Sequence, residues 1–352
     1  MKKYTHILLF LILPLFSYGK ETFYNGVDLS YLPELEAKGV KFYTKEGKEK
    51  DLLLILKSYG INSVRLRLWV DNKNCNLETT LAFAKRIKKA KLSLLLDFHY
   101  SDNWTDPGKQ RIPKAWKHFD FPSLKKQVYD YTYTVLEEFK NKGLAPELVQ
   151  IGNEINHGIL WEHGRRSVND GKNMCELLTE GAQATRKSLP KTKIMIHYAG
   201  IQGVERFYQT LSKYHVPYDI MGFSFYPWHH ERNLTTFRAV MKNLGDTYGK
   251  KVVIAETSYP WTLKEDDEKN NKISSTEEIL HEYAATKEGQ YRFVNDWLNW
   301  LKSKKSNGIG FYYWAPDYVS GKQNDVYKGS PRENLSFFDF EKKPLKVLEA
   351  FK

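Results

Sequence analysis

The chain has 352 residues, 41% of them hydrophobic, and a formal net charge of +12 at neutral pH. The apolar content is enough for one large core or two smaller ones, and with only two cysteines, Cys75 and Cys175, the chain is not a disulfide scaffold. The lysines and arginines are scattered along predicted helix faces without a groove-reading motif. We therefore interpret the positive charge as a solvated surface and expect no nucleic-acid partner.

The N-terminus has the pattern of a secretory signal. Lys2 and Lys3 precede an apolar run at 7–16, and Ser17 and Gly19 are the small residues that signal peptidase requires. The run is too short for a membrane anchor, which usually needs about twenty apolar residues. We predict a signal peptide at 1–19, a catalytic domain at 20–352, and an exported chain without a membrane span, in the periplasm or outside the cell.

Short apolar or β-branched runs alternate with amphipathic helical stretches along the rest of the chain. The run "LSLLLDFHY" at 92 is typical of the strands, and 124–142 and 290–305 are examples of the helices. The eight predicted strands begin near residues 25, 63, 92, 147, 193, 218, 251 and 308. This order predicts a single-domain (β/α)₈ TIM barrel. A doubly wound sheet is the alternative, but the glycine-rich first turn typical of that fold is missing.

Two connections are too long to be plain turns, and each follows a predicted strand. Residues 101–122 follow the third strand and contain Trp104 and Trp116, which favours an ordered loop. Residues 260–288 follow the seventh strand and carry the charged run "KEDDEKNNK". This second loop is either mobile or a place for a metal ion, with Asp266 and Asp267 as oxygen ligands for calcium. A solvated acidic run is the interpretation we favour.

Polar side chains gather where the predicted strands end, which is the reactive face of such a barrel. A charged group at the end of a buried strand is costly unless it is paired or takes part in chemistry. Many such groups at one rim therefore predict a functional site. The candidates are Asp28, Arg65, Arg67, Asp97, His99, Asn153, Glu154, His197, Tyr226, His229, Glu256, Trp314 and Asp317.

The chemistry follows from two carboxylates, because Glu154 ends the fourth strand and Glu256 ends the seventh. A facing pair of carboxyl groups suits glycoside hydrolysis, and a separation of about 5–5.5 Å or 6.5–9.5 Å decides between retention and inversion. The acid needs a raised pKa, whereas a nucleophile must stay ionised, for which Arg65 and the Tyr226 hydroxyl are candidates. The Asn153 amide is placed to hold a sugar 2-hydroxyl, and this chemistry requires no cofactor.

Aromatic residues are abundant, with 9 Trp, 23 Tyr and 19 Phe in the chain. Flat rings with a polar edge stack well on the apolar faces of sugars. Most of these rings are expected to pack in the core. Trp104 and Trp314 lie beside loop signals and charged residues, so we predict that they form a platform for sugar.

Several stretches resemble the endo-β-1,4-galactanases of glycoside hydrolase family 53. The longest is "LLDFHYSDNWTDPGKQRIPKAW", and "VRLRLWV", "VQIGNEINHGILW", "MGFSFYPWH" and "VVIAETSYPWT" follow the family order. The resemblance implies that Glu154 is the proton donor and Glu256 the nucleophile of a retaining enzyme. It also places Arg65, His99, Asn153, Tyr226 and Trp314 around the −1 sugar. The implied substrate is β-1,4-galactan, a side chain of pectin. We expect the enzyme to be a monomer.

Two departures from the family pattern limit what can be transferred. The last strand reads "YYWAPDY" where the family often has "YWEP", so Ala315 replaces a carboxylate. The loop with Asp266 and Asp267 only loosely resembles the calcium-binding loop of some bacterial members. The alternative functions are another endo-glycanase of the same clan, such as a mannanase or xylanase, and a non-catalytic barrel that binds glycans.

Overall fold

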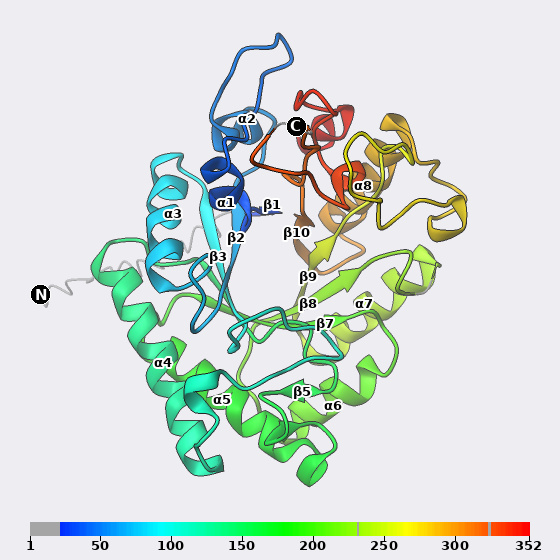
Figure 1. Ribbon diagram of the computed structural model, residues 1–352. Coiled ribbons are helices and arrows are strands. Elements are labelled where there is room, and N and C mark those ends of the chain that lie inside the picture. Colours follow the sequence, from blue (N-terminus) through cyan, green and yellow to red (C-terminus); the bar gives the residue numbers. More distant parts are fainter. Residues whose placement is uncertain (1–21, 231, 323–324) are drawn as a thin grey trace, which may run out of the picture.

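The structure is a computed structural model that describes residues 22–230, 232–322 and 325–352. The predicted signal peptide at 1–19 lies outside the described residues. Within them, eight parallel strands close into a barrel, with neighbours in the order β1-β2-β3-β4-β7-β8-β9-β10 and β10 paired to β1 (Figure 1). The predicted (β/α)₈ barrel is therefore confirmed.

The barrel strands coincide with the eight apolar runs of the sequence. Their bounds are β1 Tyr24–Asp28, β2 Ser63–Leu68, β3 Ser93–Phe98, β4 Leu148–Ile151, β7 Lys193–Ala199, β8 Ile220–Phe225, β9 Lys251–Thr257 and β10 Gly308–Trp314. The short strands β5 Gly158–Ile159 and β6 Gly164–Arg165 form a separate antiparallel hairpin after β4. The sequence did not predict this hairpin, because strands of two residues carry no periodicity.

The helices pack around the outside of the barrel (Figure 1). They are α1 Leu32–Ala37, α2 Leu52–Ser58, α3 Leu77–Lys89, α4 Phe121–Asn141, α5 Lys172–Ser188, α6 Val204–Lys213, α7 Leu234–Tyr248 and α8 Lys287–Lys302. The predicted helices at 124–142 and 290–305 correspond to α4 and α8. Each begins at a side-chain cap, Asp120 for α4 and Thr286 for α8, whose oxygen accepts a backbone N–H of the first turn. No helix in the described part of the chain is long and apolar enough to cross a bilayer.

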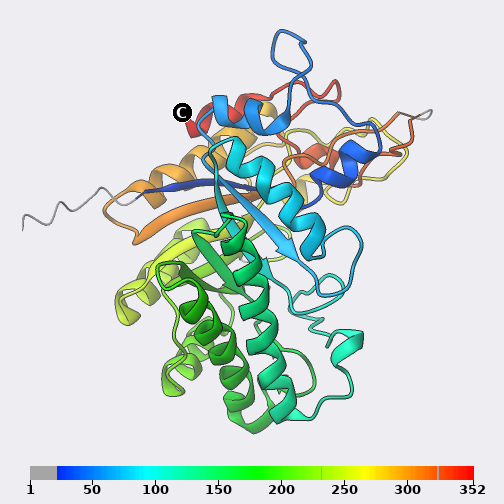
Figure 2. The same ribbon diagram turned by 90° about the vertical axis from the view of Figure 1, so that its left-hand side faces the viewer.

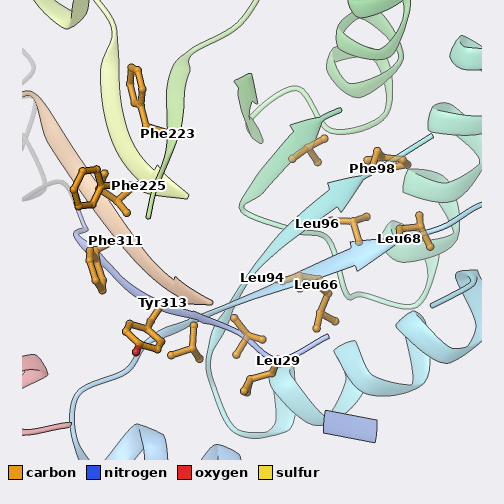
Figure 3. Packing of buried hydrophobic residues seen from close by; sticks show 14 of the residues in the cluster. Leu29, Leu66, Leu68, Leu94, Leu96, Phe98, Phe223, Phe225, Phe311 and Tyr313 are labelled. Carbon is orange, nitrogen blue, oxygen red and sulfur yellow. The ribbon is translucent and has the colours of Figure 1, made fainter. Parts of the chain in front are cut away.

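The core has two layers because successive side chains of a strand point to opposite faces. Leu94, Leu96 and Phe98 of β3 face the surrounding helices, in a layer that includes Leu66 and Leu68 of β2 (Figure 3). The barrel interior is filled by a second cluster to which β3 contributes the intervening Leu95. Its other buried members are Leu148, Met195, Ile220, Val253, Ala255, Ile309 and Tyr312.

An irregularity in β9 changes the direction of its last side chains. Phe223 of β8 pairs with Ile254, but the next residue, Ser224, pairs with Glu256, so Ala255 is an extra residue in β9. Without this bulge Glu256 would face the helices, as Ile254 does. With the bulge, Ala255 and Glu256 both point into the barrel, because one additional residue reverses the alternation.

The long connections gather at one end of the barrel, where the strands end (Figure 2). The loop after β3 is ordered around a 3₁₀ turn at Lys114–Trp116, in which Trp116 is buried. The loop after β9 contains a 3₁₀ turn at Thr276–Glu278. Both cysteines are buried and free, Cys75 before α3 and Cys175 in α5.

Candidate active site

A cleft of about 1260 Å³ opens at the C-terminal ends of the barrel strands. All eight site residues predicted from the sequence line it: Arg65, His99, Trp104, Asn153, Glu154, Tyr226, Glu256 and Trp314. They come from six of the barrel strands or the segments that follow them, so the barrel brings together residues far apart in the chain. The contacts that each of these residues makes bear on the role predicted for it.

Arg65 in β2 is the centre of the charged network at the bottom of the cleft. Its guanidinium is 1% exposed and lies 2.7 Å from Asp28 Oδ2, 2.7 Å from Asp97 Oδ2 and 2.9 Å from Glu256 Oε1. Burial alone would lower the pKa of Arg65, but these three carboxylates raise it, so the guanidinium stays charged. The contacts span β1, β2, β3 and β9 and fix their ends relative to one another.

Glu256 is held from two sides. Besides its ion pair with Arg65, its Oε2 accepts a hydrogen bond of 2.9 Å from the Tyr226 hydroxyl. Burial raises the pKa of Glu256 above its usual value, and Arg65 and the Tyr226 hydroxyl oppose this rise without cancelling it. Of the two carboxyl groups, Glu256 is therefore the one whose ionised form is stabilised by direct contact with a guanidinium.

Glu154 sits in a sharp turn after β4. Gly152 and Glu154 have positive φ angles of 78° and 49°, so the chain leaves the strand abruptly and turns the glutamate into the cleft. Its Oε1 accepts a hydrogen bond of 2.5 Å from the Ser224 hydroxyl. Burial, followed by the negative charge of Glu256, raises the pKa of Glu154 to about 8. A proton is therefore retained on Glu154 at neutral pH.

The hydrogen bonds around Ser224 indicate which oxygen of Glu154 carries that proton. Burial holds the pKa of His197 well below its usual value, so the ring is neutral. Its Nε2 lies 2.8 Å from the Ser224 hydroxyl, whereas its Nδ1 lies 3.1 Å from Gln150 Nε2, a donor, and 3.0 Å from Asn153 Oδ1, an acceptor. Ser224 donates to Glu154 Oε1, so we assign the proton of Glu154 to Oε2.

Asn153 and His99 are fixed by the protein itself. Asn153 Oδ1 accepts from Arg65 Nη2 at 2.8 Å, and its Nδ2 donates to the Thr105 carbonyl at 2.9 Å, which occupies one of the two amide hydrogens. His99 Nε2 lies 2.9 Å from Asp97, and its Nδ1 accepts from the indole of Trp69 at 3.2 Å. His99 therefore positions Asp97 as well as lining the cleft.

Aromatic rings form one wall of the cleft. The rings of Trp104 and Trp314 meet edge to face with their centres 6.2 Å apart, and the Trp314 and Tyr318 centres are 5.3 Å apart. Trp104 is 43% exposed, which is unusual for so large an apolar side chain. The guanidinium of Arg67 lies 4.0 Å from the centre of the Trp104 ring and holds it in place.

Sequence reasoning missed three polar residues of this network. Ser224 bonds Glu154, Gln150 bonds Arg65 Nε at 3.1 Å, and Gln110 donates to the Asn153 carbonyl at 2.8 Å. Ser224 and Gln150 are polar residues inside otherwise buried strands, and that was the available signal. Gln110 lies in the loop after β3, and its available signal was its place in the stretch "LLDFHYSDNWTDPGKQRIPKAW" that resembles the family.

The donors around Asp266 and Asp267 do not fit a calcium ion. Asp266 Oδ2 accepts from the Ser320 hydroxyl at 2.6 Å, and Asp267 Oδ2 accepts from the Ser330 backbone N–H at 2.9 Å. Among the described residues, no three acidic, histidine or cysteine side chains converge as metal ligands would. Asp266 is exposed as expected for a solvated run, whereas Asp267 is half-buried and joins the loops after β9 and β10.

Comparison with known proteins places this cleft in context. The model of the family described as glycosyl hydrolase family 53 matches residues 24–351. The arabinogalactan endo-beta-1,4-galactanase of Cellvibrio japonicus is 37% identical, over 91% of this chain and 88% of that protein. The endo-beta-1,4-galactanase of Bacillus subtilis is 31% identical, over 94% and 85%. The solved GH53 catalytic domain of Ignisphaera aggregans is 34% identical, with a TM-score of 0.88 and coverage of 96% and 97%.

Proposed function

The chain belongs to glycosyl hydrolase family 53, and we propose on that basis that it cleaves internal β-1,4-galactosidic bonds in galactan and type I arabinogalactan, with retention of anomeric configuration. Its curated relatives in Cellvibrio japonicus and Bacillus subtilis are named for galactan and not for mannan or xylan. The glycosidase chemistry predicted from two carboxylates agrees with this membership.

The observation that carries the proposal is the unequal environment of the two glutamates. Glu154 meets only a neutral hydroxyl and has a pKa of about 8, whereas Glu256 touches the Arg65 guanidinium. Ser224, which bonds Glu154, pairs with Glu256 across β8 and β9, so both acids lie over the same pair of strands. One protonated and one ionised carboxyl group at one site is the arrangement that glycoside hydrolysis requires.

In the first step, Glu256 attacks the anomeric carbon while Glu154 Oε2 gives its proton to the departing glycosidic oxygen. The glycosidic bond breaks, and a covalent glycosyl–Glu256 ester forms. Glu154, now ionised, takes a proton from water, and the resulting hydroxide equivalent attacks the same carbon and releases Glu256. Two inversions leave the anomeric configuration unchanged.

The surrounding residues position the sugar for this reaction. Asn153 keeps one amide hydrogen for a ligand oxygen, and we assign that hydrogen to the 2-hydroxyl, a contact that strengthens in the transition state. Trp104 and Trp314 supply the ring faces on which neighbouring sugars stack. Tyr226 and Arg65 keep the nucleophile oriented and ionised between turnovers.

The N-terminal segment leads us to propose that the enzyme is exported and acts on a polysaccharide outside the cytoplasm. We propose separately that it acts as a monomer. A polymer such as pectin galactan is reached only after export, which is consistent with the signal pattern at 1–19. Sequencing the N-terminus of the protein purified from the producing cell would test this, with the mature chain expected to begin near Lys20. An intact Met1 on the exported protein would contradict it.

Product analysis tests the proposed activity directly. Linear β-1,4-galactan is expected to give oligosaccharides of mixed length, and NMR taken early in the reaction is expected to show the β-anomer at the new reducing ends. Mannan and xylan serve as control polysaccharides. Hydrolysis of either in preference to galactan would contradict the substrate, and an initial α-anomer would contradict retention.

Substitution of the two acids tests their roles. Glu256→Ala is expected to abolish hydrolysis of every substrate, because no nucleophile remains. Glu154→Ala is expected to slow natural galactan far more than an aryl galactoside with an activated leaving group, which departs without a proton. Equal losses on both substrates would refute the assignment of Glu154 as donor, and binding without turnover by the unaltered protein would indicate a non-catalytic barrel.

A further inference from the structure

A second, smaller hollow of about 260 Å³ lies beside the cleft. It is formed by the β5–β6 hairpin, the 3₁₀ turn that follows at Val168–Gly171, and one face of α6. The two hollows share His157 and Arg166 in their linings, so the smaller one lies directly behind that wall of the cleft. Its lining consists of His157, Arg165, Arg166, Ser167, Asp170, Arg206 and Thr210.

The charges in this hollow are not balanced by the protein. Arg165 is paired with Glu162, and its guanidinium lies 3.9 Å from the centre of the Trp161 ring. Asp170 is paired with Lys213 at 2.7 Å. Within the part of the chain that the structure describes, Arg166 and Arg206 have no carboxylate within salt-bridge distance, so two positive charges remain.

Arg166 also has a hydrogen-bond donor without a partner. Its Nη1 is buried and makes no hydrogen bond with any described residue. A buried donor left unpaired is costly, by about 1–3 kcal/mol, and more for a charged group, so an acceptor is expected at that position. Burial, and then the positive charges of Arg166 and Arg165, lower the pKa of the neighbouring His157, which indicates a positive potential in this hollow.

We propose that this hollow is a subsite for the carboxylate of a uronic acid attached to the galactan chain. The inference rests on the proposed function and extends its substrate from neutral galactan to galactan that bears acidic sugar. Guanidinium groups bind carboxylates through paired, charge-assisted hydrogen bonds, and Arg166 faces both hollows. A sugar chain that leaves the cleft past Arg166 therefore brings its next residue to Arg206.

Binding is measured first, by calorimetry in a Glu256→Gln background that prevents turnover. The ligands are β-1,4-galacto-oligosaccharides of increasing length with a galacturonic acid at the reducing or the non-reducing end, and the same oligosaccharides without it. The acidic ligand of one polarity is expected to bind about tenfold more tightly than its neutral counterpart, and Arg206→Gln is expected to abolish the difference. Arg166→Gln is expected to weaken the acidic ligand in the same way.

Kinetics and controls then separate the outcomes. Arg206→Gln is expected to raise KM for the acidic substrate about tenfold and to leave neutral galactan unchanged. Lys305→Gln removes an exposed charge before β10, at the opposite end of the barrel, and is expected to change neither substrate. Inorganic phosphate is titrated as a second probe.

The inference is overturned if galactan is hydrolysed but the uronate gives no gain in affinity, or if the gain survives Arg206→Gln. It is also overturned if phosphate binds at Arg206 and the uronate does not. Failure to hydrolyse galactan would count against the proposed function instead, because the affinity gain from the uronate is still measured with the inactive variant.

Discussion

Ser224 connects the two acids of the cleft, through its hydroxyl to Glu154 and through sheet pairing to Glu256. Its hydroxyl lies 2.8 Å from His197 Nε2 and donates to Glu154, and its backbone pairs in the sheet with Glu256. Its hydrogen bond favours the ionised form of Glu154 and so lowers a pKa that burial and Glu256 raise. Ser224 therefore sets the orientation of the proton donor and limits how far its pKa rises.

We predict that Ser224→Ala moves the alkaline limb of kcat/KM to higher pH. The acid works only when protonated, and removal of the hydroxyl raises its pKa further above about 8, so protonation persists to higher pH. We also expect kcat to fall about 2–10-fold, because Oε1 loses its orienting donor. The measurement is a pH–rate profile on galactan.

The matched control is Ser63→Ala, which removes another buried strand hydroxyl, bonded to Tyr312 and not to the cleft network. It is expected to reduce stability while leaving both limbs of the profile in place. Ser224→Thr retains a hydroxyl and is expected to restore the alkaline limb. A limb that does not move in Ser224→Ala would exclude Ser224 as a determinant of the donor pKa.

At the scale of the elements, two local departures from regular strand geometry build the site. The bulge at Ala255 turns Glu256 into the barrel, and the left-handed turn at Gly152 presents Asn153 and Glu154. Gly152 has a φ of 78°, and a Cβ there would lie 2.7 Å from Ile155 Cγ2 and 3.1 Å from Ile159 Cδ1. Glycine is required by both backbone conformation and space.

Gly152→Ala is therefore expected to displace the turn and to reduce kcat on the order of a hundredfold, as misplacement by about 1 Å can. The direct strain cost is about 1–2 kcal/mol. Gly249→Ala is the matched control, because Gly249 also has positive φ, at the end of α7, but a Cβ there meets nothing within 4 Å. It should lose stability and keep kcat; equal kcat values in the two variants would disprove the role of the turn.

At the scale of the whole molecule, the raised pKa of Glu154 is also a statement about stability. The folded protein binds this proton up to a pH of about 8, whereas an unfolded chain releases it near 4.3. The contribution of Glu154 to stability is thus fully present below about pH 4.3 and declines as pH rises to about 8. The active enzyme keeps a carboxyl group where the fold disfavours its charge.

We predict that Glu154→Gln is more stable than the unaltered protein at neutral pH, by up to a few kcal/mol. The gain in melting temperature should grow between about pH 4.3 and 8 and then level off, because only the glutamate titrates there. The measurement is thermal unfolding across that range, with the exposed Glu268→Gln as control, expected to show no such trend. A gain that is independent of pH would contradict the assigned titration.

The sequence by itself determined the barrel fold and which residues lie on its active face. Each strand is a short apolar run whose pattern records burial locally, and in a parallel barrel all strand ends meet at one rim. Glu154, Glu256 and Arg65 could therefore be assigned to one cleft before any contact was known.

Only the tertiary structure decided how those residues are used. Ser224 and Glu154 are separated by 70 positions, and their bond depends on the register of β8 and on the turn after β4. The bulge in β9, the hairpin after β4 and the arginine-lined hollow behind it likewise follow from contacts between distant segments. The periodicity of a sequence indicates which face of an element is buried, but not which side chains meet across elements. Those contacts determine which glutamate holds the proton and which one is ionised.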